Sequence, residues 1–160
     1  MRDVAILGLG QTPIGEQWEM SLRDLGAQAV VAALKDAGLE AAELLVVGNM
    51  LSGSLSHQEN LGALIADYAG LRGIEALKVE AACASGAMAV RMAYLAVAGG
   101  VVDVAIACGV EKMTDGSGEE TTTALAAAAD DLFESDQGVS FVALNAMLMR
   151  RYMHEFGYRR

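Results

Sequence analysis

Several residue types are scarce in this chain of 160 residues. It has one proline, two cysteines and two histidines, and only 5% of its residues are aromatic. The cysteines lie 25 positions apart and the histidines lie far from them, so the paired spacing of a zinc site is missing. A disulfide is also disfavoured, because both cysteines lie in or beside predicted core strands.

Positive charge is scarce too. Eleven Lys and Arg stand against 21 Asp and Glu, which gives a formal net charge of −10. Nucleic acids and anionic membranes are bound through Lys and Arg, so we expect neither as a partner. The C-terminal tail is the exception. Its arginines could meet a polyanion such as the phosphates of a coenzyme, or could form a solvated helix face; they are Arg150, Arg151, Arg159 and Arg160.

The chain has no apolar run long enough for a membrane span. Its longest apolar stretch, Tyr94–Val110, is interrupted by Gly99, Gly100 and Asp103, which favours a helix, a turn and a strand. The apolar start is too short for a secretory signal, and with so few cysteines we expect a reducing, cytoplasmic setting. The hydrophobic content of 54% excludes disorder and predicts both a core and a surface for a partner.

Apolar runs and helical patterns alternate from the N-terminus to about residue 112. The predicted strands are Val4–Leu7, Leu44–Val47, Ala76–Glu80 and Val101–Ala107. Two predicted helices begin after Ser21 and Ser56. A third spans Ala84–Val97, and the last spans about Phe141–Phe156. This order predicts an α/β fold with a parallel sheet and crossover helices. Residues 113–138 are polar, alanine-rich and then acidic, and we interpret them as an excursion from the sheet domain.

Details of these helices carry further predictions. Ser21 with Asp24, and Ser56 with Glu59, have the spacing of capping boxes, and Gly38 is placed to end the first helix. The helix Ala84–Val97 is apolar on nearly every side, which predicts burial all round.

Gly8-x-Gly10 follows a predicted strand, as in dinucleotide-binding proteins. The third glycine of that motif would fall on Pro13, and no helix begins there. We therefore interpret the two glycines as a tight turn at the exit of a strand.

Cys83 is the most informative residue, because it lies between a predicted strand and a predicted helix. Unpaired N–H groups and the positive end of a helix dipole stabilise a thiolate, and small neighbours leave room for an acyl group. Backbone N–H groups there could also stabilise an oxyanion. A buried structural cysteine is the alternative from these arguments alone. Cys108, among apolar neighbours, is expected to be a core thiol.

The segment Glu80–Val90, Glu-Ala-Ala-Cys-Ala-Ser-Gly-Ala-Met-Ala-Val, resembles the nucleophile segment of the thiolase superfamily. Three further segments are similar to motifs of that family. Gln11–Gly15 resembles R-T-P-F/I-G, Gly109–Met113 resembles G-x-E-x-M, and Arg150–Gly157 resembles the loop-domain helix of sterol-carrier-type and archaeal thiolases. These matches follow the family's order along essentially the whole chain.

The resemblance implies a thiolase N-terminal α/β domain at residues 1–112, without its last strand, and the beginning of a coenzyme A-binding loop domain at 113–160. It implies an acetyl-CoA acetyltransferase or 3-ketoacyl-CoA thiolase reaction through an acyl-cysteine on Cys83. Candidate substrate-binding residues are Met88, Met113, Arg150 and Arg151. No tightly bound cofactor is expected, since the coenzyme A thioester is the substrate. The intact protein is expected to be a homodimer or homotetramer.

The resemblance also shows a departure. The family's later histidine and cysteine motifs are absent, and loss of a general base lowers rates by about 10²- to 10⁴-fold. We therefore expect the chain alone to be a poor catalyst. Two alternatives stay open: a non-catalytic short subunit completed by a partner, and half of a ketoacyl or hydroxymethylglutaryl-CoA synthase.

Overall fold

The computed structural model describes residues 2–159, which form two compact units that divide between Asp115 and Gly116. The first unit contains α1 (Leu22–Ala37), β1 (Leu44–Gly48), α2 (Ser52–Leu55), α3 (Leu61–Tyr68), β2 (Glu75–Val79), a 3-10 turn (Ala82–Ala84), α4 (Ser85–Ala98) and β3 (Ala105–Gly109). The second unit contains α5 (Gly118–Ala126), a π-helical turn (Asp131–Ser135) and α6 (Phe141–Phe156).

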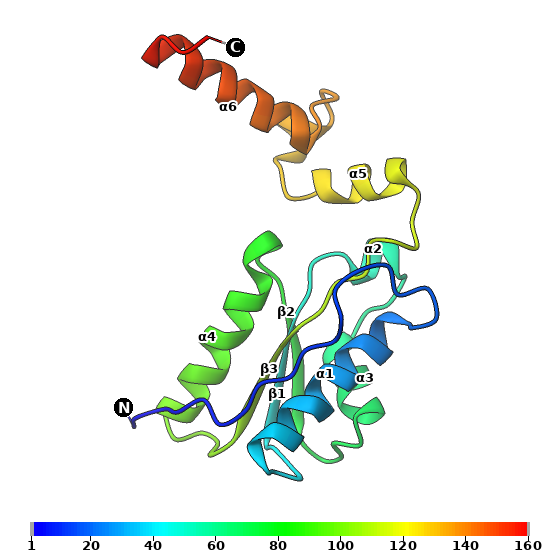
Figure 1. Ribbon diagram of the computed structural model, residues 1–160, viewed down its shortest axis with the longest axis vertical. Coiled ribbons are helices and arrows are strands. Elements are labelled where there is room, and N and C mark those ends of the chain that lie inside the picture. The colour runs from blue at the N-terminus through cyan, green and yellow to red at the C-terminus, as the bar shows by residue number, and fades with distance from the viewer. Residues whose placement is uncertain (1, 160) are drawn as a thin grey trace. The chain divides into compact units, whose positions relative to one another are not determined.

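The first unit is built on a parallel sheet with the strand order β2-β1-β3. Leu44 of β1 is paired with Glu75 on one side and with Ala105 on the other. Helices α1 and α3 cover one face of this sheet and α4 covers the other (Figure 1). The predicted α/β class with a parallel sheet and crossover helices is confirmed. Strand β3 begins at Ala105, later than the predicted start at Val101.

The core lies on both faces of β1, which is buried along its whole length. Alternate side chains of a strand point to opposite faces. Accordingly Leu45 and Val47 join the cluster with α1 and α3, while Leu44 and Val46 pack against α4. A central parallel strand covered by helices on both faces reads as a continuous apolar run, as it does here.

The predicted strand at Val4–Leu7 is wrong. These residues form no strand, and the side chain of Ile6 is 84% exposed. The segment is held instead at its ends, where the Arg2 N–H donates to the carbonyl of Ala98 (2.9 Å) and the Leu9 N–H donates to Asp36 (2.8 Å). An apolar run forms a strand only when a sheet edge pairs with it, and this segment does not pair with β3.

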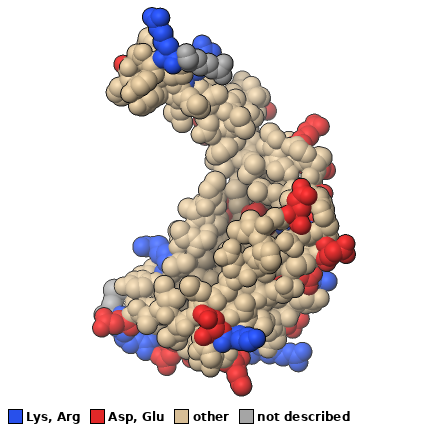
Figure 2. All heavy atoms as spheres, in the orientation of Figure 1, with Lys and Arg blue, Asp and Glu red and all other residues tan. Residues whose placement is uncertain are grey.

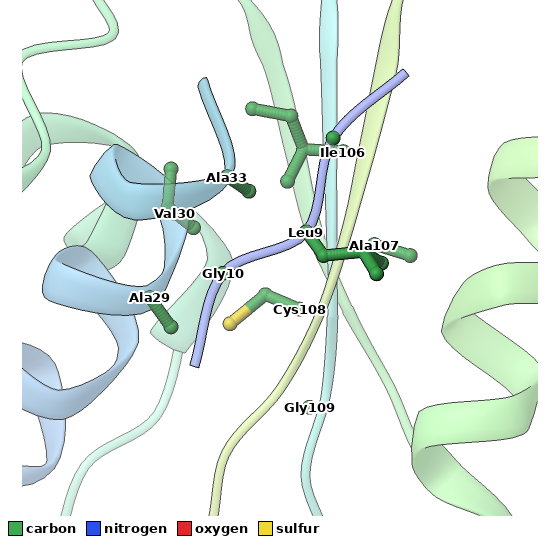
Figure 3. Close-up of a pocket in the computed structure, with 10 residues that line it drawn as sticks. Leu9, Gly10, Ala29, Val30, Ala33, Ile106, Ala107, Cys108 and Gly109 are labelled. Atoms are coloured by element: carbon green, nitrogen blue, oxygen red, sulfur yellow. The ribbon is translucent and has the colours of Figure 1, made fainter. Parts of the chain in front are cut away.

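Gly8 and Gly10 do not form the predicted strand-exit turn; they lie where the N-terminal segment passes close to the backbone of α1. A methyl group on Gly8 would lie 2.5 Å from the carbonyl oxygen of Ala33, and one on Gly10 would meet the backbone of the same helix, α1. Beside this crossing, residues of the N-terminal segment, α1 and β3 line a cavity of about 140 Å³ (Figure 3). The thiol of Cys108 points toward the cavity from β3.

The ends of the helices test the predicted caps. Ser21 and Asp24 form the predicted capping box of α1, and Gly38 ends that helix in the left-handed region at φ 67°. The box predicted at Ser56 and Glu59 is wrong, because α3 begins at Leu61 after Asn60 without a side-chain cap. Helix α6 has the predicted bounds.

Helix α4 is not buried all round as predicted. Its buried residues lie on the face that meets the sheet, while four large apolar side chains are between 37% and 59% exposed. These exposed side chains are Val90, Met92, Tyr94 and Leu95.

Candidate active site

Cys83 lies in the 3-10 turn that joins the carboxyl end of β2 to α4, and its side chain is exposed. The preceding residue, Ala82, has φ of +47°, a left-handed conformation that a residue with a β-carbon seldom adopts. Such strain persists only where surrounding contacts hold it in place, and it concentrates at functional sites. The backbone therefore turns sharply just before the thiol and presents it at the start of a long helix.

Ser85 braces this turn from inside. Its hydroxyl accepts a hydrogen bond from the Ala81 N–H (3.0 Å) and donates one to the carbonyl of Ala82 (2.7 Å). Ser85 is only 5% exposed and both bonds are part-buried, so water competes less for them than it would at the surface. On the outer side the Glu80 carboxylate accepts from the Ala82 N–H. This brace could not be predicted from the sequence, since a serine at the start of a helix indicates only a cap.

A second polar cluster lies beside this turn, where β1 and β3 end. One Glu111 oxygen accepts from the Asn49 side chain (2.8 Å), and the other accepts from the N–H groups of Met50 (3.0 Å) and Leu51 (3.1 Å). Asn49 is 1% exposed and also accepts from the Ser52 N–H (2.9 Å). Glu111 thus fixes the loop after β1 to the end of β3. Only the Gly-x-Glu motif pointed to Glu111, and nothing in the sequence pointed to Asn49.

The carboxyl ends of parallel strands are where α/β proteins place their functional groups. Here that edge carries an exposed thiol on a strained turn, at the start of a helix and next to fixed polar loops. The comparison with known families agrees with this arrangement, since residues 4–153 match the family "Thiolase, N-terminal domain". The chain belongs to the thiolase family.

Named thiolases and related enzymes are similar over nearly the whole chain. It is 49% identical to an acetyl-CoA acetyltransferase of Methanothermobacter thermautotrophicus over 100% of its length, and 47% identical to one of Methanocaldococcus jannaschii over 98%. The chain spans 42% and 40% of the length of these two relatives. Among solved structures, the Acat5 thiolase of Ascaris suum in complex with coenzyme A aligns with a TM-score of 0.58 at 28% identity. That alignment covers 63% of this chain and 28% of the other.

The two cysteines of this thiolase domain differ sharply in environment. Cys83 is exposed, whereas Cys108 is 5% exposed, as expected of a core thiol. Burial raises the pKa of the Cys108 thiol to about 11, because a thiolate is poorly solvated there. Its nearest acceptor, the carbonyl oxygen of Gly26, lies 3.9 Å from the sulfur. Its burial and raised pKa therefore make Cys108 a poor nucleophile near neutral pH.

The other candidate residues are spread over both units. Met88 is half-buried on α4, the helix that Cys83 precedes, and Met113 is 39% exposed beyond β3. Arg150 and Arg151 are exposed on α6 in the second unit, where basic side chains gather at the C-terminal end (Figure 2). Arg151 pairs with Glu155 (2.5 Å), and Arg160 lies outside the described residues. Their roles in substrate binding stay predictions.

Residues 2–159 contain no group of three His, Cys, Asp or Glu side chains that could hold a metal ion. Within the same range, every helix is too short or too polar to cross a membrane.

Proposed function

We propose that this chain carries the nucleophile of an acetyl-CoA acetyltransferase, with Cys83 as the residue that is acylated. The observation that carries the proposal is the exposed Cys83 thiol on a strained, braced turn at the start of α4. The names of the two archaeal relatives support acetyl-CoA as the acyl donor. The coenzyme A complex of the Ascaris suum thiolase supports a coenzyme A thioester as the substrate. No tightly bound cofactor is part of the proposal.

The proposed chemistry is acyl exchange between two sulfur atoms. The Cys83 thiolate attacks the carbonyl carbon of acetyl-CoA, and the negative charge moves to the carbonyl oxygen near the N–H groups of the helix start. The tetrahedral intermediate collapses, the bond to the coenzyme's sulfur breaks, and coenzyme A leaves with the proton that Cys83 lost. Exchange of one thioester for another is nearly balanced in free energy, so positioning and thiolate formation set its rate.

Further parts of the proposal concern the second unit and the sheet. Arg150 and Arg151 are proposed to meet the phosphates of coenzyme A, with Met88 and Met113 near the acyl group. The outer edge of β3, beside the cavity in Figure 3, is proposed to take the last strand of the domain. The intact protein is proposed to be a cytoplasmic homodimer or homotetramer.

Isotope exchange tests the acyl-cysteine. The chain is mixed with acetyl-CoA and labelled coenzyme A only, and the transfer of label into acetyl-CoA is followed. We expect exchange faster than that produced by an equal concentration of N-acetylcysteine, abolished by Cys83→Ala and retained by Cys108→Ala. The rate should fall about 10²- to 10⁴-fold short of an enzyme with a general base. Exchange that survives Cys83→Ala, or never exceeds that of the free thiol, would overturn the proposal.

A further inference from the structure

The start of α4 lies unusually close to the end of the central strand. Gly48 is the last residue of β1, and a methyl group built on it would lie 2.5 Å from the carbonyl carbon of Ser85 and 2.8 Å from the nitrogen of Gly86. Side-chain carbons do not approach backbone atoms this closely, so a larger residue at position 48 must displace the helix start or the strand. The backbone of Gly48 itself is extended, and the lack of space alone requires glycine there.

Two of the three atoms nearest to that methyl on Gly48 belong to Ser85, the residue that braces the turn Ala82–Ala84 in which Cys83 lies. Ser85 holds the N–H of Ala81 and the carbonyl of Ala82 through its buried hydroxyl. A displacement of the Ser85 backbone therefore moves both ends of the turn in which Cys83 lies. The strand itself has little freedom to yield, because β1 is buried and paired on both sides.

We propose that Gly48 and Ser85 together are positioning residues, which set the height and direction of the Cys83 thiol over the carboxyl edge of the sheet. Because Gly48 has no side chain, the first turn of α4 can pack directly against the end of β1. The hydrogen bonds of Ser85 then hold the turn Ala82–Ala84 in a fixed position relative to α4. This inference rests on the proposed acylation of Cys83 and adds the residues that position its thiol.

Two reactions of the same thiol distinguish positioning from simple exposure. Acyl transfer from phenyl thioacetate requires the thiolate and the N–H groups near it to reach one carbonyl group together. Alkylation by iodoacetamide at a tetrahedral carbon requires only an accessible thiolate. Both rates at Cys83 are measured by mass spectrometry of the Cys83 peptide. Their ratio does not depend on the fraction of Cys83 that is present as thiolate, so it reports how well the thiolate is positioned.

Three glycine variants give a graded comparison. Gly48→Ala places a methyl against the start of α4. Gly62→Ala is the matched control, because its methyl would lie 2.5 Å from the carbonyl carbon of Leu77, a comparable clash with backbone atoms on the face of the sheet covered by α3. Gly109→Ala is the mild control, since its methyl would lie 3.6 Å from the α-carbon of Gly86, an ordinary contact.

We expect Gly48→Ala to lower the ratio of acyl transfer to alkylation by at least about tenfold, since small misplacements of a reacting group cost up to about 100-fold. Gly62→Ala should lower thermal stability and leave the ratio within about threefold, and Gly109→Ala should leave both near the parent values. If Gly48→Ala does not fold, Ser85→Ala, which introduces no clash, decides the question through the same fall in ratio.

The outcomes separate this inference from the proposed function. A parent chain whose Cys83 is acylated no faster than N-acetylcysteine contradicts the proposed function itself. A parent chain that is acylated efficiently, with a ratio unchanged in folded Gly48→Ala or in Ser85→Ala, overturns the positioning role. An equal fall in Gly62→Ala also overturns it, because a general loss of stability would then explain the effect.

Discussion

Replacing Glu111 by alanine tests whether the polar cluster at the carboxyl edge holds the first unit together. The substitution removes a carboxylate that accepts three hydrogen bonds from the loop after β1. Asn49 keeps a bond from its side chain to the carbonyl of Val110 (2.8 Å), so its amide stays partly satisfied. The N–H groups of Met50 and Leu51 lose their acceptor.

The size of the effect follows from the surroundings of each bond. Hydrogen bonds to a charged group contribute about 1.5–3 kcal/mol each when shielded from water, and less when exposed. The bonds from Asn49 and Leu51 are part-buried, whereas the bond from Met50 is exposed. Counting the shielded pair at the lower value gives a loss of about 3 kcal/mol in the free energy of unfolding. For a unit of this size the midpoint of thermal unfolding should fall by roughly 10 °C.

Urea and thermal unfolding followed by far-UV circular dichroism measure this loss. Glu40→Ala is the matched control, because Glu40 is exposed and its removal changes the net charge of −10 equally. The control should lie within about 0.5 kcal/mol of the parent. A Glu111→Ala chain that is as stable as the control would refute the inference that this cluster ties the loop to β3.

Three other perturbations have expected outcomes. Ser21→Ala removes the side-chain cap of α1 and should lower the free energy of unfolding by about 1 kcal/mol in urea titrations, whereas an unchanged midpoint would contradict the capping role. The raised pKa of Cys108 favours the neutral thiol in the folded state, so stability should fall between about pH 9 and about pH 11 as the unfolded state loses its proton. At pH 10 the free energy of unfolding should be about 1.4 kcal/mol lower than at neutral pH for this reason, and this loss should be missing in Cys108→Ala. An equal loss in that variant would exclude the Cys108 thiol as its source. Iodoacetamide at neutral pH should label the Cys83 peptide long before the Cys108 peptide, and equal labelling in the folded chain would contradict the burial of Cys108.

Local chemistry made parts of this fold predictable. The cap at Ser21, the left-handed Gly38 and the bounds of α6 depend on residues within one turn of each helix end, so the sequence contains all the necessary information. Cys83 could be located for the same reason, because its strand, turn and helix are contiguous. The buried run Leu44–Val47 was also recognisable, since a strand covered on both faces is apolar throughout.

Features that depend on distant partners could not be predicted. The run Val4–Leu7 looks like a strand, yet it forms none because it does not pair with β3. Helix α4 is apolar on nearly every side, which predicted burial all round, but only the face toward the sheet is covered. A hydrophobic pattern shows which faces could be buried and does not show which other elements cover them. Glu111 and Asn49 lie 62 positions apart, and only the parallel pairing of β1 with β3 brings them together. The contact between Gly48 and Ser85 has the same origin.

Peptide mass spectrometry after exposure of the chain to acetyl-CoA shows whether Cys83 carries the acyl group. Both cysteines are present in each molecule, so the acetyl occupancy of Cys108 serves as an internal reference for that of Cys83. We expect an acetyl group on the Cys83 peptide, removed by neutral hydroxylamine as a thioester must be, and little or none on Cys108. An acetyl group that resists hydroxylamine, or equal occupancy of the two cysteines in the folded chain, would contradict the assignment of Cys83 as the acyl carrier.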